Sequence, residues 1–344
     1  MKKCSKILVG YFPAAPFFLI YGGGETQLMN PFHSLQNHSD LEVRLINLFE
    51  KDAKYDIIHF FGLHYSHYRA IKLAKAKGII VVLSPISYAT KKVLLGSIFH
   101  RVNRFFSFPT TQWLHRECLK LADFILPNSY EEFNYLESYF NLKLANRSRI
   151  VYNAISHDFF DNVNFEFRDK YKIDNYILCV GKIEPRKNQL LLAKLFENTE
   201  YKLVFVGAKM YDAAEYYEKF QEIINNSNNI IHIEEFPQSS PLFKSAYKSA
   251  KVHVLLGENE TPGMVSIEAG VAGCNIVVHD CKPVREYFGN FAFYCKIQDN
   301  DSIINAVQNA FHSEKNPEFP AFLLSSYNWN KVAADYREVY KSLI

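Results

Sequence analysis

The sequence predicts an α/β protein with two doubly wound, Rossmann-like parallel sheets. Short apolar runs alternate with helical stretches along most of the chain, which is typical of parallel strands joined by helices. This alternation pauses over residues 156–175 and then starts again, so we expect two domains. A length of 344 residues, with 48% hydrophobic and 22% charged residues, is sufficient for two globular domains.

The first domain is predicted over residues 1–155. Its strands are expected at 6–11, 41–47, 55–60, 78–84, 122–127 and 149–152. Its helices are expected near 25–36, 64–77 and 130–140. The helical period of 64–77 places Leu73 and Ala74 on the inward face, with Gly78 just past the helix end.

The second domain is predicted over residues 176–326. Its strands are expected at 176–181, 202–207, 229–233, 251–256, 275–278 and 291–295. Its helices are expected near 188–197, 212–226, 241–250 and 264–272. Residues 156–175 are polar, aromatic and aperiodic and are therefore predicted to be an interdomain linker. The stretch 329–343 is amphipathic and predicts a final helix within 327–344.

Cysteine spacing and hydropathy suggest a reducing, cytoplasmic compartment. The six cysteines are scattered without a Cys-x-x-Cys pair, so we expect buried free thiols. The chain starts with a short basic segment and a strand, in which we expect no cleavable leader. No apolar run approaches the ~20 residues that cross a bilayer.

The positive charge is concentrated in one part of the chain. Residues 57–116 contain nine lysines and arginines and no aspartate or glutamate. Within this span, residues 91–116 also carry many aromatic and aliphatic side chains. The segment is either an amphipathic helical pair packed on the sheet, or a surface that contacts anionic phospholipid at the membrane. We favour the membrane surface and expect no nucleic-acid partner, because no RNA- or DNA-binding motif accompanies the cations.

Residues 257–289 predict a ligand site at the entry to a helix. The loop GENETPG follows a buried strand and leads into the helix at 264–272, whose first amides have no intrahelical partners. Gly263 permits close approach of a ligand, and the flanking Glu260 and Glu268 can accept hydrogen bonds from sugar hydroxyls. An anion clamp with carboxylates on either side suits a nucleotide-sugar. The alternative is that both glutamates are solvated charges beside an ordinary turn.

A second loop carries three cations within six residues. Lys182, Arg186 and Lys187 precede the helix that is expected from residue 188. Cations at a helix N-terminus are unfavourable by roughly 0.3–1 kcal/mol each. A bound diphosphate would make all these interactions attractive, so the loop predicts a phosphate site. The alternative is that the three side chains simply point into water.

These stretches together resemble glycosyltransferase family 4, whose members are retaining enzymes with the GT-B fold. Residues 260–268 resemble its E-x7-E signature, and residues 181–188 (GKIEPRKN) resemble its phosphate-binding loop. Residues 22–25 (GGGE) resemble its glycine-rich loop, and residues 149–155 (RIVYNAI) resemble the segment that closes its first domain. The resemblance is to the bacterial polysaccharide and lipopolysaccharide type of this family.

The resemblance implies an acceptor-binding first domain and a donor-binding second domain, facing each other across a cleft, with residues 327–344 crossing back to the first. It implies that Glu260 binds the donor sugar and that Lys182 and Lys187 hold the diphosphate, and these three form the expected catalytic set. The remaining donor-binding residues implied by the resemblance are Gly23, Gly24, Arg186, Gly263, Met264, Val265 and Glu268, the last of which would bind ribose. Neither a cofactor nor a metal is implied.

The sequence departs from the family where a histidine usually follows the strand at 78–84. Residues 84–88 read Ser-Pro-Ile-Ser-Tyr, so the expected acceptor-side residues are His64, Ser87 and Tyr88. Lys182 also stands where the family usually has arginine. The predicted function is retaining transfer of a sugar to a glycan acceptor, expected to be lipid-linked, by a protein peripheral to the inner membrane face. The alternatives are a non-catalytic nucleotide-sugar-binding or partner subunit, and an epimerase of similar fold.

Overall fold

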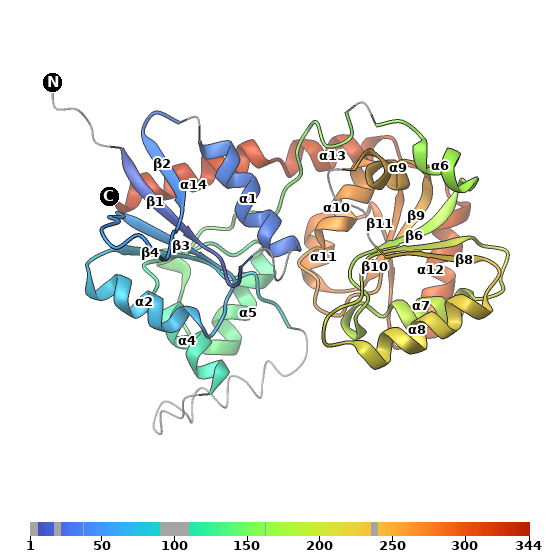
Figure 1. The fold of residues 1–344 in the computed structure, drawn as a ribbon, viewed down its shortest axis with the longest axis horizontal. Coiled ribbons are helices and arrows are strands. Elements are labelled where there is room, and N and C mark those ends of the chain that lie inside the picture. Colours follow the sequence, from blue (N-terminus) through green and yellow to red (C-terminus); the bar gives the residue numbers. More distant parts are fainter. Residues whose placement is uncertain (1–5, 17–21, 37, 90–109, 162, 235–239) are drawn as a thin grey trace. The chain divides into compact units, whose positions relative to one another are not determined.

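The computed structural model describes residues 6–16, 22–36, 38–89, 110–161, 163–234 and 240–344. The chain divides into two compact units (Figure 1). The first comprises Met1–Ala154 together with Tyr327–Ile344, and the second comprises Ile155–Ser326. Each unit contains one parallel sheet, so the predicted α/β class with two doubly wound sheets is confirmed.

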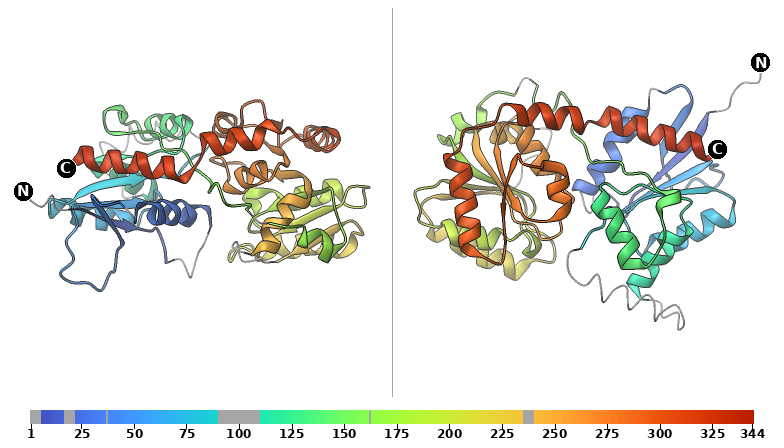
Figure 2. Two further views of the ribbon diagram at one scale, coloured as in Figure 1. Left: turned by 90° about the horizontal axis from the view of Figure 1, so that it is seen from above. Right: turned by 180° about the vertical axis from the view of Figure 1, so that it is seen from behind.

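The first unit has a five-stranded parallel sheet in the order β2-β1-β3-β4-β5. Its strands are β1 (Ile7–Phe12), β2 (Leu41–Leu45), β3 (Ile57–Phe61), β4 (Ile80–Ser84) and β5 (Phe124–Ile125). Its helices are α1 (Gly23–Leu35), α2 (His67–Ala76), α4 (Thr111–Leu121), α5 (Tyr130–Phe140), α14 (Trp329–Leu343) and the 3-10 turn η1 (Ala145–Arg147). Helices α2, α4 and α5 cover one face of the sheet, and α1 and α14 cover the other (Figures 1 and 2).

The second unit has a six-stranded parallel sheet in the order β11-β10-β9-β6-β7-β8. Its strands are β6 (Tyr176–Val180), β7 (Leu203–Val206), β8 (Ile230–Ile233), β9 (Ala250–Leu255), β10 (Asn275–His279) and β11 (Ala292–Cys295). Its helices are α6 (Glu166–Tyr171), α7 (Gln189–Phe196), α8 (Ala214–Asn226), α9 (Pro241–Ser249), α10 (Met264–Val271), α11 (Lys282–Phe288), α12 (Asn300–His312), α13 (Glu318–Ser326) and the 3-10 turn η2 (Pro185–Lys187). Helices α7, α8 and α12 pack on one face of the sheet, and α9 and α10 pack on the other (Figure 1).

The stretch 156–175, predicted to be an interdomain linker, falls wholly within the second unit. Helix α6 forms within it and packs against α9. Phe167 is fully buried, and its amide donates a 2.8 Å hydrogen bond to the Ser245 hydroxyl. A helix of six residues with one buried side chain is too short to produce a visible helical period.

Two smaller predictions in the first unit are also wrong. Residues 149–152 are not a strand, although the Arg149 amide donates to the Ile125 carbonyl of the short strand β5 and the Val151 amide donates to the Pro127 carbonyl. In α2, Ala74 is buried as expected, but Leu73 is 57% exposed and Ile71 faces the core instead. The burial in α2 shows an inward stripe of His67, Ile71 and Ala74, so the period was assigned one residue out of phase.

The cysteines and the hydropathy of the helices were also predicted from the sequence. The described cysteines are buried free thiols, as predicted: Cys118, Cys179, Cys274, Cys281 and Cys295. Most of the basic stretch 91–116 lies outside the described residues. Among the described helices, none is both long and apolar enough to span a bilayer.

A buried hydrogen-bond network attaches the C-terminal helix to the first sheet. His59 of β3 is fully buried, with Nδ1 2.7 Å from the Tyr340 hydroxyl and Nε2 2.8 Å from the Ser84 hydroxyl. Tyr340 in turn donates a 3.0 Å hydrogen bond to the Tyr11 hydroxyl. These bonds assign the proton to Nδ1, because Tyr340 already uses its own proton on Tyr11. The surface of α14 adds an ion pair from Arg337 to Asp40 at 2.8 Å.

Candidate functional site

The candidate site of the second unit lies where the order of its strands reverses. From β6 the chain continues to β7 and β8 on one side of the sheet, whereas β9, β10 and β11 lie on the other side. The switch point is therefore between β6 and β9, which pair in parallel. Ligands of open α/β sheets bind outside the carboxyl ends of the strands at such a point. The loops that follow β6 and β9 are the cationic loop and the GENETPG loop of the sequence.

Direct hydrogen bonds join these two loops. The Glu258 amide donates to the Arg186 carbonyl at 3.2 Å. The Asn188 side-chain amide donates to the Leu256 carbonyl at 2.8 Å. Asn188 has φ of +55° and ends η2 immediately before α7, a left-handed position that asparagine tolerates better than most residues. Two segments about seventy residues apart in sequence thus form one rim at the end of the sheet.

Arg186 lies between two carboxylates of this rim. Its guanidinium donates to Glu260 Oε1 at 2.7 Å and to Glu184 Oε1 at 2.8 Å. Burial lowers the pKa of Arg186, but the two carboxylates outweigh it and the net pKa is raised. Arg186 is therefore always charged, and Glu260 is fixed by it. A bound anion would compete with these carboxylates for the guanidinium.

The two lysines of the loop differ in their surroundings. Lys187 is mostly buried, and its ammonium is 4.0 Å from Glu184 Oε1. It fills the place where a Cβ of Gly181 would be, and Gly181 has φ of +136°. Lys182 is only half-buried, and in the described part of the chain it has no ion-pair partner. The glycine thus allows Lys187 to lie across the end of β6, close to where an anion would bind.

The helix that follows the second loop begins at a position that requires glycine. Gly263 has φ of +84°, and a Cβ there would be 2.6 Å from Leu255 Cδ2 and 3.1 Å from Glu260 Oε2. The next residues, Met264 and Val265, open α10. Their amides lie in the first turn, where backbone donors have no partner within the helix. The entry to α10 therefore presents backbone donors beside the Glu260 carboxylate.

Glu268 is a buried carboxylate held by a tyrosine. It lies on α10, is 6% exposed, and accepts a 2.7 Å hydrogen bond from the Tyr247 hydroxyl of α9 through Oε2. Burial raises the pKa of Glu268 to about 7, although Tyr247 and Lys244 both lower it. Near neutral pH this carboxylate is therefore present in both protonation states. Sequence analysis identified Glu268 but not Tyr247, whose helix is far from any recognised motif.

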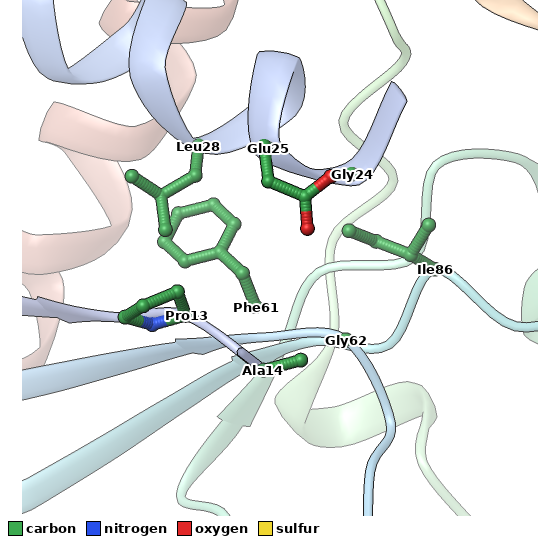
Figure 3. A pocket seen from close by; sticks show the side chains of 8 residues that line it. All are labelled: Pro13, Ala14, Gly24, Glu25, Leu28, Phe61, Gly62 and Ile86. Atoms are coloured by element: carbon green, nitrogen blue, oxygen red, sulfur yellow. The ribbon is translucent and has the colours of Figure 1, made fainter. Parts of the chain in front are cut away.

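The first unit has a pocket at the switch point of its own sheet. The order β2-β1-β3-β4-β5 places that switch point between β1 and β3. A pocket of about 110 Å³ lies at the carboxyl ends of β1, β3 and β4, below the start of α1 (Figure 3). Its lining residues are Pro13, Ala14, Gly24, Glu25, Leu28, Phe61, Gly62 and Ile86. Of these, Gly24 was among the residues predicted to bind the donor, and Gly23 is the residue before it at the start of α1.

The predicted acceptor-side residues are not part of this pocket lining. The His64 Nδ1 is bonded to the Ser66 hydroxyl at 2.6 Å. The Ser87 amide donates to Glu132 Oε1, and the Tyr88 ring packs edge-on against Tyr135. The pocket residues Phe61, Gly62 and Ile86 were missed. Their signal was positional, because they lie at or just beyond the ends of two strands near the switch point.

Comparisons with known proteins show which family model and which solved structures this chain resembles. Residues 161–320 match the family model described as Glycosyl transferases group 1. HepE of Anabaena, solved in complex with UDP, superposes with a TM-score of 0.72 at 12% identity, covering 98% of this chain and 100% of HepE. Sucrose-phosphate synthase from Thermosynechococcus elongatus gives a TM-score of 0.65 at 17% identity, covering 84% of this chain and 74% of the synthase. No curated protein matches the sequence significantly.

A third similar structure is the UDP-forming α,α-trehalose-phosphate synthase from Burkholderia xenovorans, solved with glucose-6-phosphate. It has a TM-score of 0.67 at 10% identity and covers 98% of this chain and 100% of the synthase. At such low identities the superpositions show the fold, which is GT-B. The group 1 match over residues 161–320 lies within the second unit and, together with the GT-B fold, supports a glycosyltransferase.

Proposed function

We propose that the protein transfers a sugar from a nucleoside diphosphate sugar to a hydroxyl of a glycan, with retention of anomeric configuration. The observation that carries this proposal is the joining of the two loops at the switch point of the second sheet. Hydrogen bonds between 186 and 258 and between 188 and 256 bring three cations, two carboxylates and a helix entry together. A diphosphate flanked by hydroxyl-bearing rings matches that set of groups.

Each group of this site has a proposed role. Lys187 and Lys182 bind the diphosphate, and the amides from Gly263 to Val265 complete its clamp. Arg186 exchanges a carboxylate for a phosphate oxygen, which frees Glu260 to accept hydrogen bonds from the donor sugar. Glu268 accepts from the ribose hydroxyls while Tyr247 holds its other oxygen.

The transfer step needs no external base, because the leaving phosphate oxygen takes the proton of the acceptor. The acceptor hydroxyl oxygen attacks the anomeric carbon on the face from which the diphosphate leaves. The bond between that carbon and the phosphate oxygen breaks, and the leaving oxygen takes the acceptor proton. Negative charge develops on the diphosphate, where the cations and amides stabilise it. For this reason we propose that neither a divalent metal nor an organic cofactor is required.

The finer assignment rests on sequence resemblance. We place the enzyme in family 4 and in bacterial surface polysaccharide or lipopolysaccharide (O-antigen) synthesis. Because HepE was solved with UDP and with UDP-glucose, uridine diphosphate sugars are the first donors to test. The cations of 91–116 support a lipid-linked acceptor at an anionic membrane surface. If vesicles containing anionic lipid fail to retain the protein at low salt, the membrane part of the proposal is wrong.

Release of nucleoside diphosphate in the presence of an acceptor tests the function. Wild-type protein, Glu260→Ala and Lys187→Ala are compared with Lys194→Ala, an exposed lysine on α7 outside the loop. We expect acceptor-dependent release by the wild type and by Lys194→Ala, and loss of release in the other two variants. Equal, slow release by all four proteins would contradict the proposal.

A non-catalytic sugar-nucleotide-binding subunit is the second candidate. It is favoured by the sequence after β4, where Ser84-Pro85-Ile86-Ser87-Tyr88 lacks the histidine usual in the family. Binding of a UDP-sugar without acceptor-dependent turnover, across a broad acceptor panel, would support this candidate.

A further inference from the structure

Strand β8 of the second unit carries a histidine among aromatic side chains. The His232 ring is half-buried and packs edge-on against Phe220 at 5.2 Å and Tyr217 at 5.9 Å between ring centroids. Burial is the main cause that lowers the pKa of His232, although the Gly207 carbonyl and Glu234 oppose the shift, so the ring is neutral at pH 7. A neutral imidazole in such surroundings loses hydration at both nitrogens, and hydrogen bonds must offset that loss.

Both ring nitrogens of His232 are hydrogen-bonded, and the partners determine the tautomer. Nε2 lies 3.0 Å from the Gly207 carbonyl oxygen, and Nδ1 lies 2.7 Å from the Gln221 side-chain nitrogen. A carbonyl oxygen only accepts, so these partners assign the proton to Nε2. Nδ1 then accepts a hydrogen bond from the Gln221 amide. Helix α8 therefore orients the ring through Gln221, and the ring in turn holds Gly207.

Gly207 lies directly against the start of the cationic loop that follows β6. It has φ of +155°, and a Cβ on it would overlap the Gly181 carbonyl and lie 3.1 Å from the Lys182 backbone nitrogen. Only glycine allows the two chain segments to approach this closely. The next carbonyl, that of Ala208, accepts a 2.9 Å hydrogen bond from the Ile183 amide. The backbone at 207–208 thus supports residues 181–183 from behind.

The supported residues lead into the proposed diphosphate clamp. Lys187 lies across Gly181, in the place of the missing Cβ. The Met210 amide donates to the Ile183 carbonyl at 3.2 Å, so the segment after β7 is bonded to both the amide and the carbonyl of Ile183. A shift of Gly207 would therefore move Gly181 and change the place that Lys187 occupies. Such a clamp is effective only when its donors are held in position before the anion binds.

We propose that His232 is a positioning residue for the diphosphate clamp, which acts through the Gly207 carbonyl and is itself oriented by Gln221. This inference rests on the proposed transferase function, because it assigns His232 to the diphosphate site of that reaction. His232 acts through the backbone and not by contact with the donor. Loss of its hydrogen bond leaves a partly buried carbonyl unpaired and should cost about 10-fold in affinity for the diphosphate.

Titration calorimetry with UDP on the full chain tests this role. His232→Phe keeps an aromatic ring but removes both hydrogen bonds, and it should weaken UDP binding by about 10-fold. His232→Gln retains a side-chain N–H donor for the Gly207 carbonyl and should bind UDP within about two-fold of the wild type. Gln221→Leu leaves the ring without its orienting partner and should give an intermediate loss of about three-fold.

The matched control is Asn229→Ala, at the opposite end of β8. The Asn229 side chain donates to the Phe196 carbonyl at 2.8 Å and to the Tyr201 carbonyl at 2.7 Å. Its loss should lower the temperature of thermal unfolding at least as much as His232→Phe does, because two buried carbonyls lose a donor. UDP affinity should nevertheless equal that of the wild type. The control therefore separates positioning of the clamp from general stability.

Two results would overturn the positioning role. One is wild-type affinity for UDP in His232→Phe. The other is an equal loss of affinity in His232→Phe, His232→Gln and Asn229→Ala, which would trace the effect to stability alone. Lys187→Ala is measured in parallel: if it loses UDP while His232→Phe does not, only the positioning role is wrong. If the wild type does not bind UDP, the proposed transferase function is contradicted and the positioning role with it.

Discussion

The two sheets have switch points of the same geometry but opposite chemistry. In the first unit the ends of β1 and β3 border an apolar pocket with one carboxylate, Glu25. In the second unit the loops after β6 and β9 carry three cations, and Arg186 alone contacts two carboxylates. Because both sheets are parallel and reverse their order beside their first strand, topology determines where each site lies. The residues that follow the strands determine what each site can bind.

The two sheets also differ in how they hold a fully buried histidine. His59 lies on β3, beside the first strand of its sheet, and both of its ring nitrogens are hydrogen-bonded. His253 lies on β9, also beside the first strand of its sheet, and the Leu178 backbone is near its ring, but neither ring nitrogen meets a partner in hydrogen-bond geometry within the described structure. Burial lowers the pKa of both rings, to about 3 for His253, so both are neutral. His59 thus attaches a helix to its sheet, whereas His253 makes no such attachment and lies near the Lys187 charge.

The largest expected effect is on UDP affinity, which should depend on the second switch point and not on the first. Replacing Lys187 with alanine removes a mostly buried cation from the proposed diphosphate clamp and should weaken UDP binding by about 100-fold. Glu25→Gln, at the other switch point, should leave UDP affinity unchanged. Titration calorimetry with UDP measures both variants, with Lys194→Ala as the control for loss of a lysine. A large loss with Glu25→Gln, or none with Lys187→Ala, would contradict the division of roles.

The two histidines predict stability changes of different sign. His59→Leu leaves the Tyr340 and Ser84 hydroxyls without their partner and should destabilise the protein by roughly 2–3 kcal/mol. His253→Leu removes a buried ring that lacks hydrogen bonds and should be neutral or stabilising by up to about 1 kcal/mol. Denaturant unfolding of both variants measures the difference. If both replacements cost the same, the contrast between the two buried rings is not real.

A smaller effect concerns the pH dependence of donor binding at Glu268. The ionised carboxylate accepts hydrogen bonds from ribose more strongly than the protonated acid, so UDP affinity should rise through about pH 7 and then level off. Tyr247→Phe removes a hydrogen bond that lowers this pKa, so the midpoint should move upward and affinity at pH 7 should fall roughly five-fold. Glu268→Gln should abolish the pH dependence. The control is Tyr211→Phe, since Tyr211 is 74% exposed.

The same carboxylate predicts a trend in stability. The folded pKa of Glu268 is raised from 4.5 to about 7, so the folded state binds the proton more tightly than the unfolded state. The free energy of unfolding should therefore fall as the pH rises from about 4.5 to 7 and stay constant above that range. A difference between wild type and Glu268→Gln isolates this contribution. An opposite slope in that difference would show that the carboxylate is stabilised in its charged form.

The smallest expected effect is that of a chelator. If the cations and amides of the second switch point neutralise the diphosphate, EDTA should leave acceptor-dependent release of UDP within about two-fold of its untreated rate. The Asp299-Asn300-Asp301 segment has the spacing of a metal-binding Asp-x-Asp motif, but Asp299 caps α12 by accepting from the Ser302 amide at 3.1 Å. Loss of activity in EDTA and its recovery with Mn²⁺ or Mg²⁺ would contradict the proposed metal independence.

The hydrophobic pattern of the sequence was sufficient to predict the positions of most strands and helices. Strands such as β4 and β6 are buried apolar runs that end at Pro85 and Gly181 respectively, and their positions were predicted within two residues. Helix α6 and the phase of α2 were not predicted, because burial there depends on single contacts such as that between Phe167 and Ser245. In a six-residue helix, one such contact outweighs any periodic signal.

The sequence by itself determined the class of fold, the two loops of the second unit and the kinds of charge they carry, because strand periods and loop motifs are local properties of the chain. Only the tertiary structure decided that Arg186 pairs with Glu260, that Tyr247 holds Glu268, and that Glu25 faces a pocket with Phe61 and Ile86. These partners come from different strands and helices. Their proximity follows from the order of strands in each sheet, which depends on long-range packing and not on any local segment.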